Sequence, residues 1–146
     1  MSYKVSVEGE GATIGIEVFD YENPLAQHPD DASWLKAELT VQVGPFSGSF
    51  KTSVTTHDLA ALCARTEQAL QMLSGRVSFE TTEGDLTLNM EFSKSGKVQI
   101  EGTAQPNGTL KTALQFRFQT DPSALDQMVR GLKVVTQRFP ARQVQA

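Results

Sequence analysis

The sequence predicts an α+β domain in which an antiparallel meander of about eight strands, in one sheet or two, is covered by two helices. Most segments alternate apolar and polar residues with a period of two, a pattern typical of strands that bury one face. Two segments instead repeat apolar residues every three to four positions, as amphipathic helices do. The order of four strands and one helix occurs twice, which we interpret as an internal ββββα duplication.

Four strands are expected in the first half. The apolar faces of the first two carry Tyr3, Val5, Val7, Ile14, Ile16 and Val18. The clearest alternation runs from Leu35 to Val43, and the Gly44-Pro45 turn leads into a fourth strand. The glycine-rich stretch 44–49 joins two strands, and no helix N-terminus follows it that could bind a phosphate. We therefore interpret it as a turn with a bulge or a close backbone approach.

The first helix follows this strand pair. Thr55 and Asp58 are spaced as a capping box, and Gly75 stands where a C-terminal cap is expected. Its apolar stripe consists of Leu59, Leu62, Cys63, Thr66, Leu70 and Leu73. Because Cys63 lies on this stripe, we expect a buried structural thiol rather than a nucleophile.

A second group of four strands follows. Its apolar positions are Val77, Phe79, Leu86, Leu88, Met90, Phe92, Val98, Ile100, Leu110, Leu114, Phe116 and Phe118. A hairpin turn is expected at Asn107-Gly108. Asp121 and Pro122 then begin a second helix, which Pro140 ends. We expect one domain over residues 1–139, with pseudo-repeats at about 1–75 and 76–139, and a flexible tail over 140–146.

The alternation fails from Asp20 to Ala32, where two prolines and four acidic residues indicate a long loop. Long loops often carry function, and its acidic side chains form a candidate patch for a partner. The candidate partner-binding residues are Asp20, Tyr21, Glu22, Asp30 and Asp31. The alternative is a solvated loop in which Asp30 or Asp31 caps a local turn.

Composition limits the classes of function. Thirteen basic and seventeen acidic residues give a net charge of −4, which disfavours direct nucleic-acid binding. One cysteine gives no internal disulfide, and no stretch resembles a signal peptide or a membrane helix, so a cytoplasmic protein is expected. His28 and His57 lack partners at metal-binding or acid–base spacing. We expect no enzyme, no catalytic residue, no metal site and no cofactor.

Several motifs, taken in order, resemble one protein family. They are Trp34-Leu35-x-Ala37-x-Leu39-x-Val41, Gly44-x-Phe46-x-Gly48-x-Phe50, Thr55-x-x-Asp58-Leu59, Leu70-x-x-Leu73-x-Gly75, Glu83-Gly84-x-Leu86-x-Leu88, Gly96-x-Val98-x-Ile100-x-Gly102 and Phe116-x-Phe118-x-Thr120-Asp121. Over about residues 12 to 139 the chain resembles the WapI family of bacterial immunity proteins. The acidic loop is where it matches least.

The resemblance implies a protein that binds and neutralises the C-terminal domain of a cognate wall-associated or contact-dependent toxin, without turnover. It also implies a basic, RNA-cleaving toxin domain, which would suit the acidic loop. Two other readings stay open. One is a small-ligand binding module with a deep apolar pocket. The other is a structural or assembly protein, such as a homodimer, that pairs through exposed sheet edges.

Overall fold

The computed structural model describes residues 2–106 and 112–142. Two antiparallel sheets follow each other along the chain, with strand orders β1-β2-β3-β4 and β5-β6-β7-β8. The first comprises β1 (Tyr3–Gly9), β2 (Ala12–Tyr21), β3 (Trp34–Val43) and β4 (Phe46–Thr55), and the second β5 (Arg76–Glu80), β6 (Leu86–Phe92), β7 (Val98–Ala104) and β8 (Leu114–Thr120). The helices are α1 (Pro29–Ala32), α2 (Thr56–Met72) and α3 (Pro122–Arg138). The predicted α+β class and ββββα order are confirmed.

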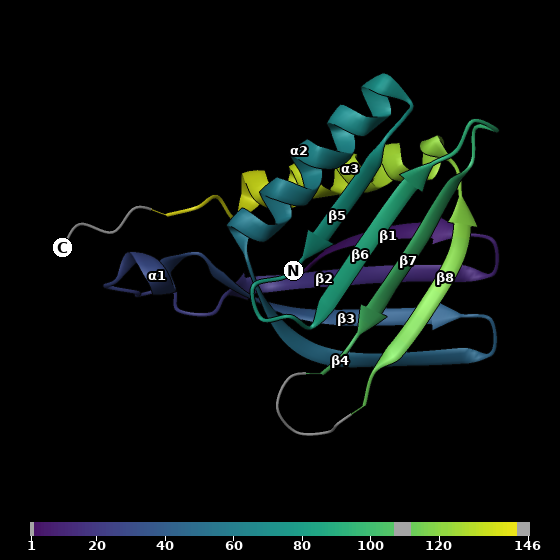
Figure 1. Cartoon of the computed structure of the whole chain (residues 1–146). Helices are drawn as coiled ribbons and strands as arrows, with labels where there is room; N and C mark the ends of the chain where they lie inside the picture. The colour runs from purple at the N-terminus through teal and green to yellow at the C-terminus, as the bar shows by residue number, and fades with distance from the viewer. Residues whose placement is uncertain (1, 107–111, 143–146) are drawn as a thin grey trace.

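Each long helix contacts the half of the chain to which it does not belong. Helix α2, which follows the first sheet, contacts β5 of the second half as well as its own β4, and α3, which follows the second sheet, contacts β1. The two helices also contact each other (Figure 1). At Gly131 of α3 an added Cβ would come within 3.4 Å of both methyl groups of Val5, so the missing side chain lets this helix lie close to β1. The halves are thus interlocked.

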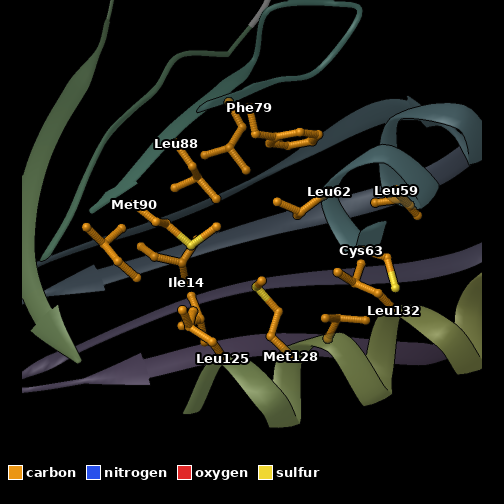
Figure 2. Packing of buried hydrophobic residues seen from close by; sticks show 14 of the residues in the cluster. Ile14, Leu59, Leu62, Cys63, Phe79, Leu88, Met90, Leu125, Met128 and Leu132 are labelled. Atoms are coloured by element: carbon orange, nitrogen blue, oxygen red, sulfur yellow. The ribbon is translucent and has the colours of Figure 1, made fainter. Parts of the chain in front are cut away.

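One core joins the two sheets and the two long helices. Figure 2 shows Ile14 from the first sheet, Phe79, Leu88 and Met90 from the second, Leu59, Leu62 and Cys63 from α2, and Leu125, Met128 and Leu132 from α3. The period-two and helical stripes read from the sequence supply these residues, and their apolar burial is the main force that holds the layers together. Cys63 is buried, as expected.

The helix caps are those predicted from the sequence, with one exception. The Thr55–Asp58 capping box is present, and the Asp121 side chain caps α3 by accepting from the Ala124 amide at 3.0 Å. The C-terminal cap was predicted at Gly75, and this is wrong. Helix α2 ends at Met72, and Leu73 adopts the left-handed conformation with φ 50°. Gly75 instead has φ 98° in the turn that leads into β5.

Hydrogen bonds join the two sheets at two corners. At the first, the Glu10 amide donates to the Gln119 carbonyl at 2.9 Å, and Thr120 Oγ1 donates to the Glu8 carbonyl. A Cβ on Gly9 would lie 2.5 Å from that same Gln119 oxygen, so only glycine fits there. At the second corner, Thr52 Oγ1 donates to the buried Asp85 carboxylate at 2.6 Å.

The glycine-rich stretch is a turn, as expected at Gly44, which has φ 58°. The bulge or close backbone approach that was predicted together with the turn is wrong at Gly48. The register of β3 with β4 continues without a shift from Val43↔Phe46 to Trp34↔Thr55. Within the described residues no atom lies within 4 Å of a Cβ built on Gly48. The Asn107-Gly108 hairpin turn and Leu110 lie outside the described residues.

Candidate functional site

A β-bulge in β2 reorients the side chains at the end of the first sheet. Val18 pairs with Ala37 and Asp20 pairs with Lys36, so Phe19 has no partner on β3. The extra residue shifts the alternation by one position. Val18 is fully buried, whereas Phe19 is 41% exposed and Asp20 is also exposed. The bulge therefore places an aromatic ring and a carboxylate next to each other at the surface.

Charged side chains surround Phe19 in a shallow depression on the outer face of the first sheet. Its lining includes Phe19, Glu22, Lys36, Glu38, Lys51 and Ser53. We call these residues, together with Asp20, the Phe19 surface. Just beside it, Glu17 of β2 stands directly opposite Glu38 of β3. Each of the two also faces a lysine on its other neighbouring strand, Lys4 of β1 opposite Glu17 and Lys51 of β4 opposite Glu38, so charges of both signs alternate across the sheet here.

Arg142 connects the end of the described chain to the loop between β2 and β3. Its side chain donates to three loop carbonyls, those of Ala32 at 2.6 Å, Pro24 at 2.9 Å and Asn23 at 2.7 Å. Its amide donates to Ser33 Oγ at 3.2 Å. The loop carbonyls use most of the donors of the guanidinium fork. The loop is therefore held in one conformation from a position more than a hundred residues away.

Tyr21 forms the other side of this arrangement. Its ring packs edge-on against Phe139 with 5.5 Å between centroids, and its hydroxyl donates to the Pro140 carbonyl at 2.7 Å. The Arg142 guanidinium lies over its face. Burial raises the pKa of the Tyr21 hydroxyl, while the positive charges of Arg142 and Arg138 act in the opposite direction. Tyr21 therefore has a structural role in the protein without a bound partner.

The five sequence-predicted partner residues take different positions. Asp20 is exposed, and its carboxylate accepts a hydrogen bond from the Tyr21 amide at 2.7 Å. Glu22 is partly buried and accepts from Ser53 Oγ of β4 at 2.7 Å. Asp30 and Asp31 belong to α1, where the Asp31 side chain is exposed. The bulge and the sheet therefore bring Asp20 and Glu22 toward Phe19, and Asp30 and Asp31 stand on the separate α1 turn.

Sequence reasoning missed the residues that organise this region. The expected loop began at Asp20, but Asp20 and Tyr21 still belong to β2, and α1 interrupts the remainder. Phe19 was missed because a bulge leaves only a weak signal, here two adjacent apolar residues, Val18 and Phe19. Arg142 was missed because its contacts are all distant in sequence.

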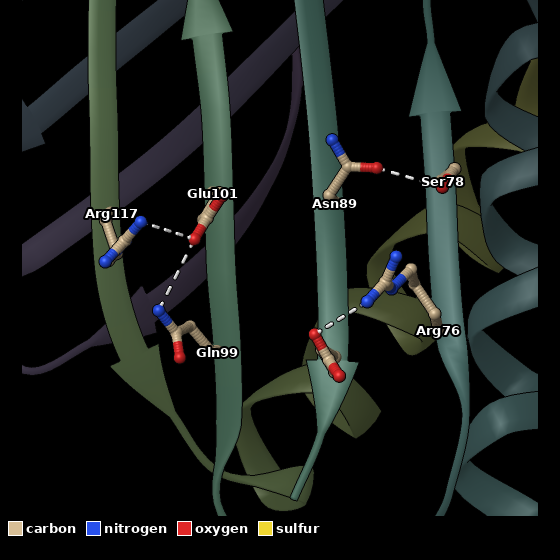
Figure 3. Close-up of polar contacts among 7 residues, drawn as sticks. Arg76, Ser78, Asn89, Gln99, Glu101 and Arg117 are labelled. Carbon is tan, nitrogen blue, oxygen red and sulfur yellow. Dashed lines mark hydrogen bonds and ion pairs between the residues drawn. The ribbon is translucent and has the colours of Figure 1, made fainter.

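The outer face of the second sheet is polar and internally paired (Figure 3). Arg76 pairs with Glu91 at 3.1 Å, Arg117 pairs with Glu101 at 2.8 Å, and Ser78 donates to Asn89 at 2.9 Å. Since these charges already neutralise each other in solvent, this face offers little electrostatic attraction to a partner. The Phe19 surface also mixes charges of both signs, but it adds a partly exposed aromatic ring, which makes it the stronger candidate for recognition.

The described residues hold few groups suited to catalysis. No cluster of three or more His, Cys, Asp or Glu side chains able to bind a metal ion occurs among them. Both histidines are exposed. Cys63 is buried against the Val129 carbonyl, and burial raises the pKa of its thiol, which keeps it unreactive. In the part of the chain that the structure describes, no helix is long and apolar enough to cross a membrane.

The comparison with known families is consistent with this arrangement. The model of the family described as "Immunity protein WapI-like family" matches residues 6–140 of the 146-residue chain. The match covers both sheets, both long helices and the Phe19 surface. No curated protein matches the chain.

Proposed function

The chain belongs to the immunity protein WapI-like family, and from this premise we propose that it binds a cognate toxin domain and blocks its activity by stoichiometric association. The family match over nearly the whole chain carries this proposal. An inhibitor of this kind needs a stable scaffold and a complementary surface, and it needs no catalytic group of its own. A rigid two-sheet scaffold around one core meets the first need.

The Phe19 surface supports the proposal as the place where the toxin docks. A partly exposed aromatic side chain surrounded by charged residues resembles the centre of a binding hot spot with a polar rim. The residues on either side of the bulge, Val18 and Asp20, both pair with β3, which fixes the backbone that carries Phe19. Asp20, Glu22 and Glu38 lie around it together with Lys36 and Lys51, so its polar rim carries charges of both signs.

We further propose that the toxin domain is basic and that it cleaves RNA. A protein that binds RNA has to attract phosphates with lysine and arginine, and an inhibitor of it gains association rate by offering carboxylates. The net charge of −4 and the exposed Asp20 and Asp31 agree with this choice of partner. Binding would take place in the cytoplasm of the cell that the protein protects.

The small-ligand alternative gains no support from the interior. The apolar gap between the sheets and the helices has a volume of about 40 Å³. Pockets for drug-sized ligands measure roughly 300–1,000 Å³. A gap of this size has room for about one water molecule.

Co-purification of the tagged protein with the toxin C-terminal domain encoded immediately upstream tests the proposal. We expect a one-to-one complex in which RNA cleavage by the toxin is suppressed. An unrelated immunity protein of similar charge is the control, because it separates specific binding from general attraction to a basic domain. A toxin that stays free and active at equimolar protein would refute the proposal.

A further inference from the structure

Strand β4 is an edge of the first sheet, and no described strand pairs with its outer side. At two other edges the described residues include a protecting contact. Arg65 of α2 donates to the Ser78 carbonyl of β5 at 3.0 Å, and the Glu10 amide beside β1 bonds to the end of β8. Strand β4 extends over ten residues with no bulge, no internal proline and one charged side chain, Lys51. Long edges without such interruptions pair readily with another strand.

The face of β4 that points toward the core carries two aromatic side chains that the core does not fully bury. Phe46 is 65% exposed, and Phe50 is only partly buried. Between them lies Gly48, which weakens a strand and would normally mark the approach of another group. Within the described residues nothing approaches it. The sequence Phe46-x-Gly48-x-Phe50 therefore presents two rings on either side of an empty position.

The free hydrogen-bonding groups of this edge follow from the register. The two-residue turn Gly44-Pro45 makes Val43 and Phe46 the first hydrogen-bonded pair of the hairpin. Every second residue of β4 from Phe46 onward thus bonds to β3, and the intervening residues direct their amides and carbonyls outward. These outward residues are Ser47, Ser49, Lys51 and Ser53.

We propose that β4 pairs antiparallel with β4 of a second copy of this chain, in a two-fold register centred on Ser49. In this register Ser49 faces Ser49 of the second copy, and Ser47 faces Lys51, which gives about six backbone hydrogen bonds. Phe50 then lies opposite the empty Gly48 position, with the Phe46 and Phe50 rings of the second copy on its diagonals. The strand is complementary to itself.

Charge and backbone chemistry select this register over its neighbours. A register centred on Lys51 would place two lysines opposite each other, whereas the proposed register places each lysine opposite a serine. Ser53 would face Pro45, which has no amide hydrogen, so the pairing ends there. The result is a continuous eight-stranded sheet across the two copies, with the exposed aromatic rings covered.

Cysteine cross-linking tests the register directly. Paired residues lie about 5.5 Å apart between Cα atoms, within the range that a disulfide spans. We expect Ser49→Cys to form a covalent dimer under mild oxidation, because Cys63 is buried and does not compete. The matched control is Thr40→Cys, the β3 partner of Ser49 on the same face. Two such residues would be about three strand spacings apart, roughly 14 Å, and should stay unlinked.

Charge pairing supplies a second, independent measurement. Because Ser49 meets itself, Ser49→Lys and Ser49→Glu should each weaken dimerisation by about threefold to tenfold in sedimentation equilibrium. A mixture of the two variants should recover a heterodimer. Circular dichroism of each variant alone shows whether its fold is retained.

Each result decides the proposal. Cross-linking of Ser49→Cys but not Thr40→Cys, together with rescue in the Lys/Glu mixture, would support it. A wild-type protein that stays monomeric at millimolar concentration would overturn it, and so would equal cross-linking of the two cysteine variants. If the Ser49 variants instead lose toxin binding while the free protein is monomeric, β4 pairs with the toxin and the second-copy proposal is wrong.

Discussion

The guanidinium carbon of Arg142 lies 3.8 Å from the ring centroid of Tyr21. This contact joins the end of the described chain to the end of β2, and the same guanidinium binds the carbonyls of the β2–β3 loop. The acidic loop therefore takes its shape from a residue outside every helix and strand. Three hydrogen bonds from this one cation hold the loop in its conformation.

Arg142→Ala should loosen the loop. The variant loses three hydrogen bonds to carbonyls and the contact with the Tyr21 ring, so we expect a loss of about 1–3 kcal/mol in the free energy of unfolding. Amide hydrogen exchange over residues 22–33 should accelerate, and urea denaturation measures the stability. Arg142→Lys keeps the charge without the planar fork and should recover only part of both effects. Unchanged exchange in the loop would contradict the role assigned to Arg142.

Tyr21→Phe should reveal a dependence of stability on alkaline pH. Burial holds the folded-state pKa of Tyr21 above its ordinary value of 10.0. Its stabilising effect is thus fully present below pH 10 and is lost as the pH rises through the raised pKa. The variant lacks the Tyr21 hydroxyl and therefore its hydrogen bond to the Pro140 carbonyl. Near neutral pH it should be about 1 kcal/mol less stable than the wild type.

The difference between wild type and Tyr21→Phe should shrink as the pH rises above 10. Urea denaturation of both proteins between pH 8 and pH 11, a range set around the ordinary value of about 10, measures it. The other titrating groups are common to the two proteins and cancel. A constant difference across this range would show that the Tyr21 hydroxyl is not buried as described.

Asp58→Ala should destabilise the protein more than Asp121→Ala, although both residues cap a helix. The Asp58 carboxylate accepts from the Thr55 amide at 3.2 Å and from the amide and hydroxyl of Thr82 at 3.1 and 2.8 Å. It therefore links α2 to the turn between β5 and β6. We expect about 2–4 kcal/mol for Asp58→Ala and about 1 kcal/mol for Asp121→Ala in chemical denaturation. Equal losses would mean that the contact with Thr82 adds no stability.

Phe19→Ala should weaken toxin binding while the free energy of unfolding changes little. A partly exposed anchor that fills a pocket on the partner contributes about 2 kcal/mol or more to binding, which corresponds to roughly a thirtyfold weaker affinity. Calorimetric titration with the toxin domain measures it. Met72→Ala is the control, because Met72 is 67% exposed at the end of α2, away from the Phe19 surface. Equal affinities for the two variants would place the interface elsewhere.

Reversing the charges of α1 tests the contribution of this helix to toxin binding separately from that of the Phe19 surface. Replacement of Asp30 and Asp31 by lysine should slow association with a basic toxin and reduce its salt dependence, with little effect on the dissociation rate. Stopped-flow measurements at two salt concentrations test this. An association rate that does not change would remove α1 from the interaction and leave the Phe19 surface alone.

Much of the fold could be predicted from the sequence because its signals are local. The alternation from Leu35 to Val43 and the Asp121-Pro122 helix start depend on neighbours within a few residues, and both are confirmed. The helix end at Gly75 was placed wrongly because Leu73 adopts a conformation that leucine rarely takes. The candidate site was harder to predict from the sequence, because a bulge at Phe19 and a residue of the tail, Arg142, shape it.

By itself the sequence determined the strands and the two long helices, the order in which they come, and which of their faces are apolar. Periodicity and caps are properties of short stretches, so they can be read without a structure. Only the tertiary structure decided that the strands form two sheets, that each long helix contacts the other half, and that Arg142 lies on Tyr21. These relationships join residues far apart in the chain, and the packing of one shared core selects them from many arrangements with the same local pattern.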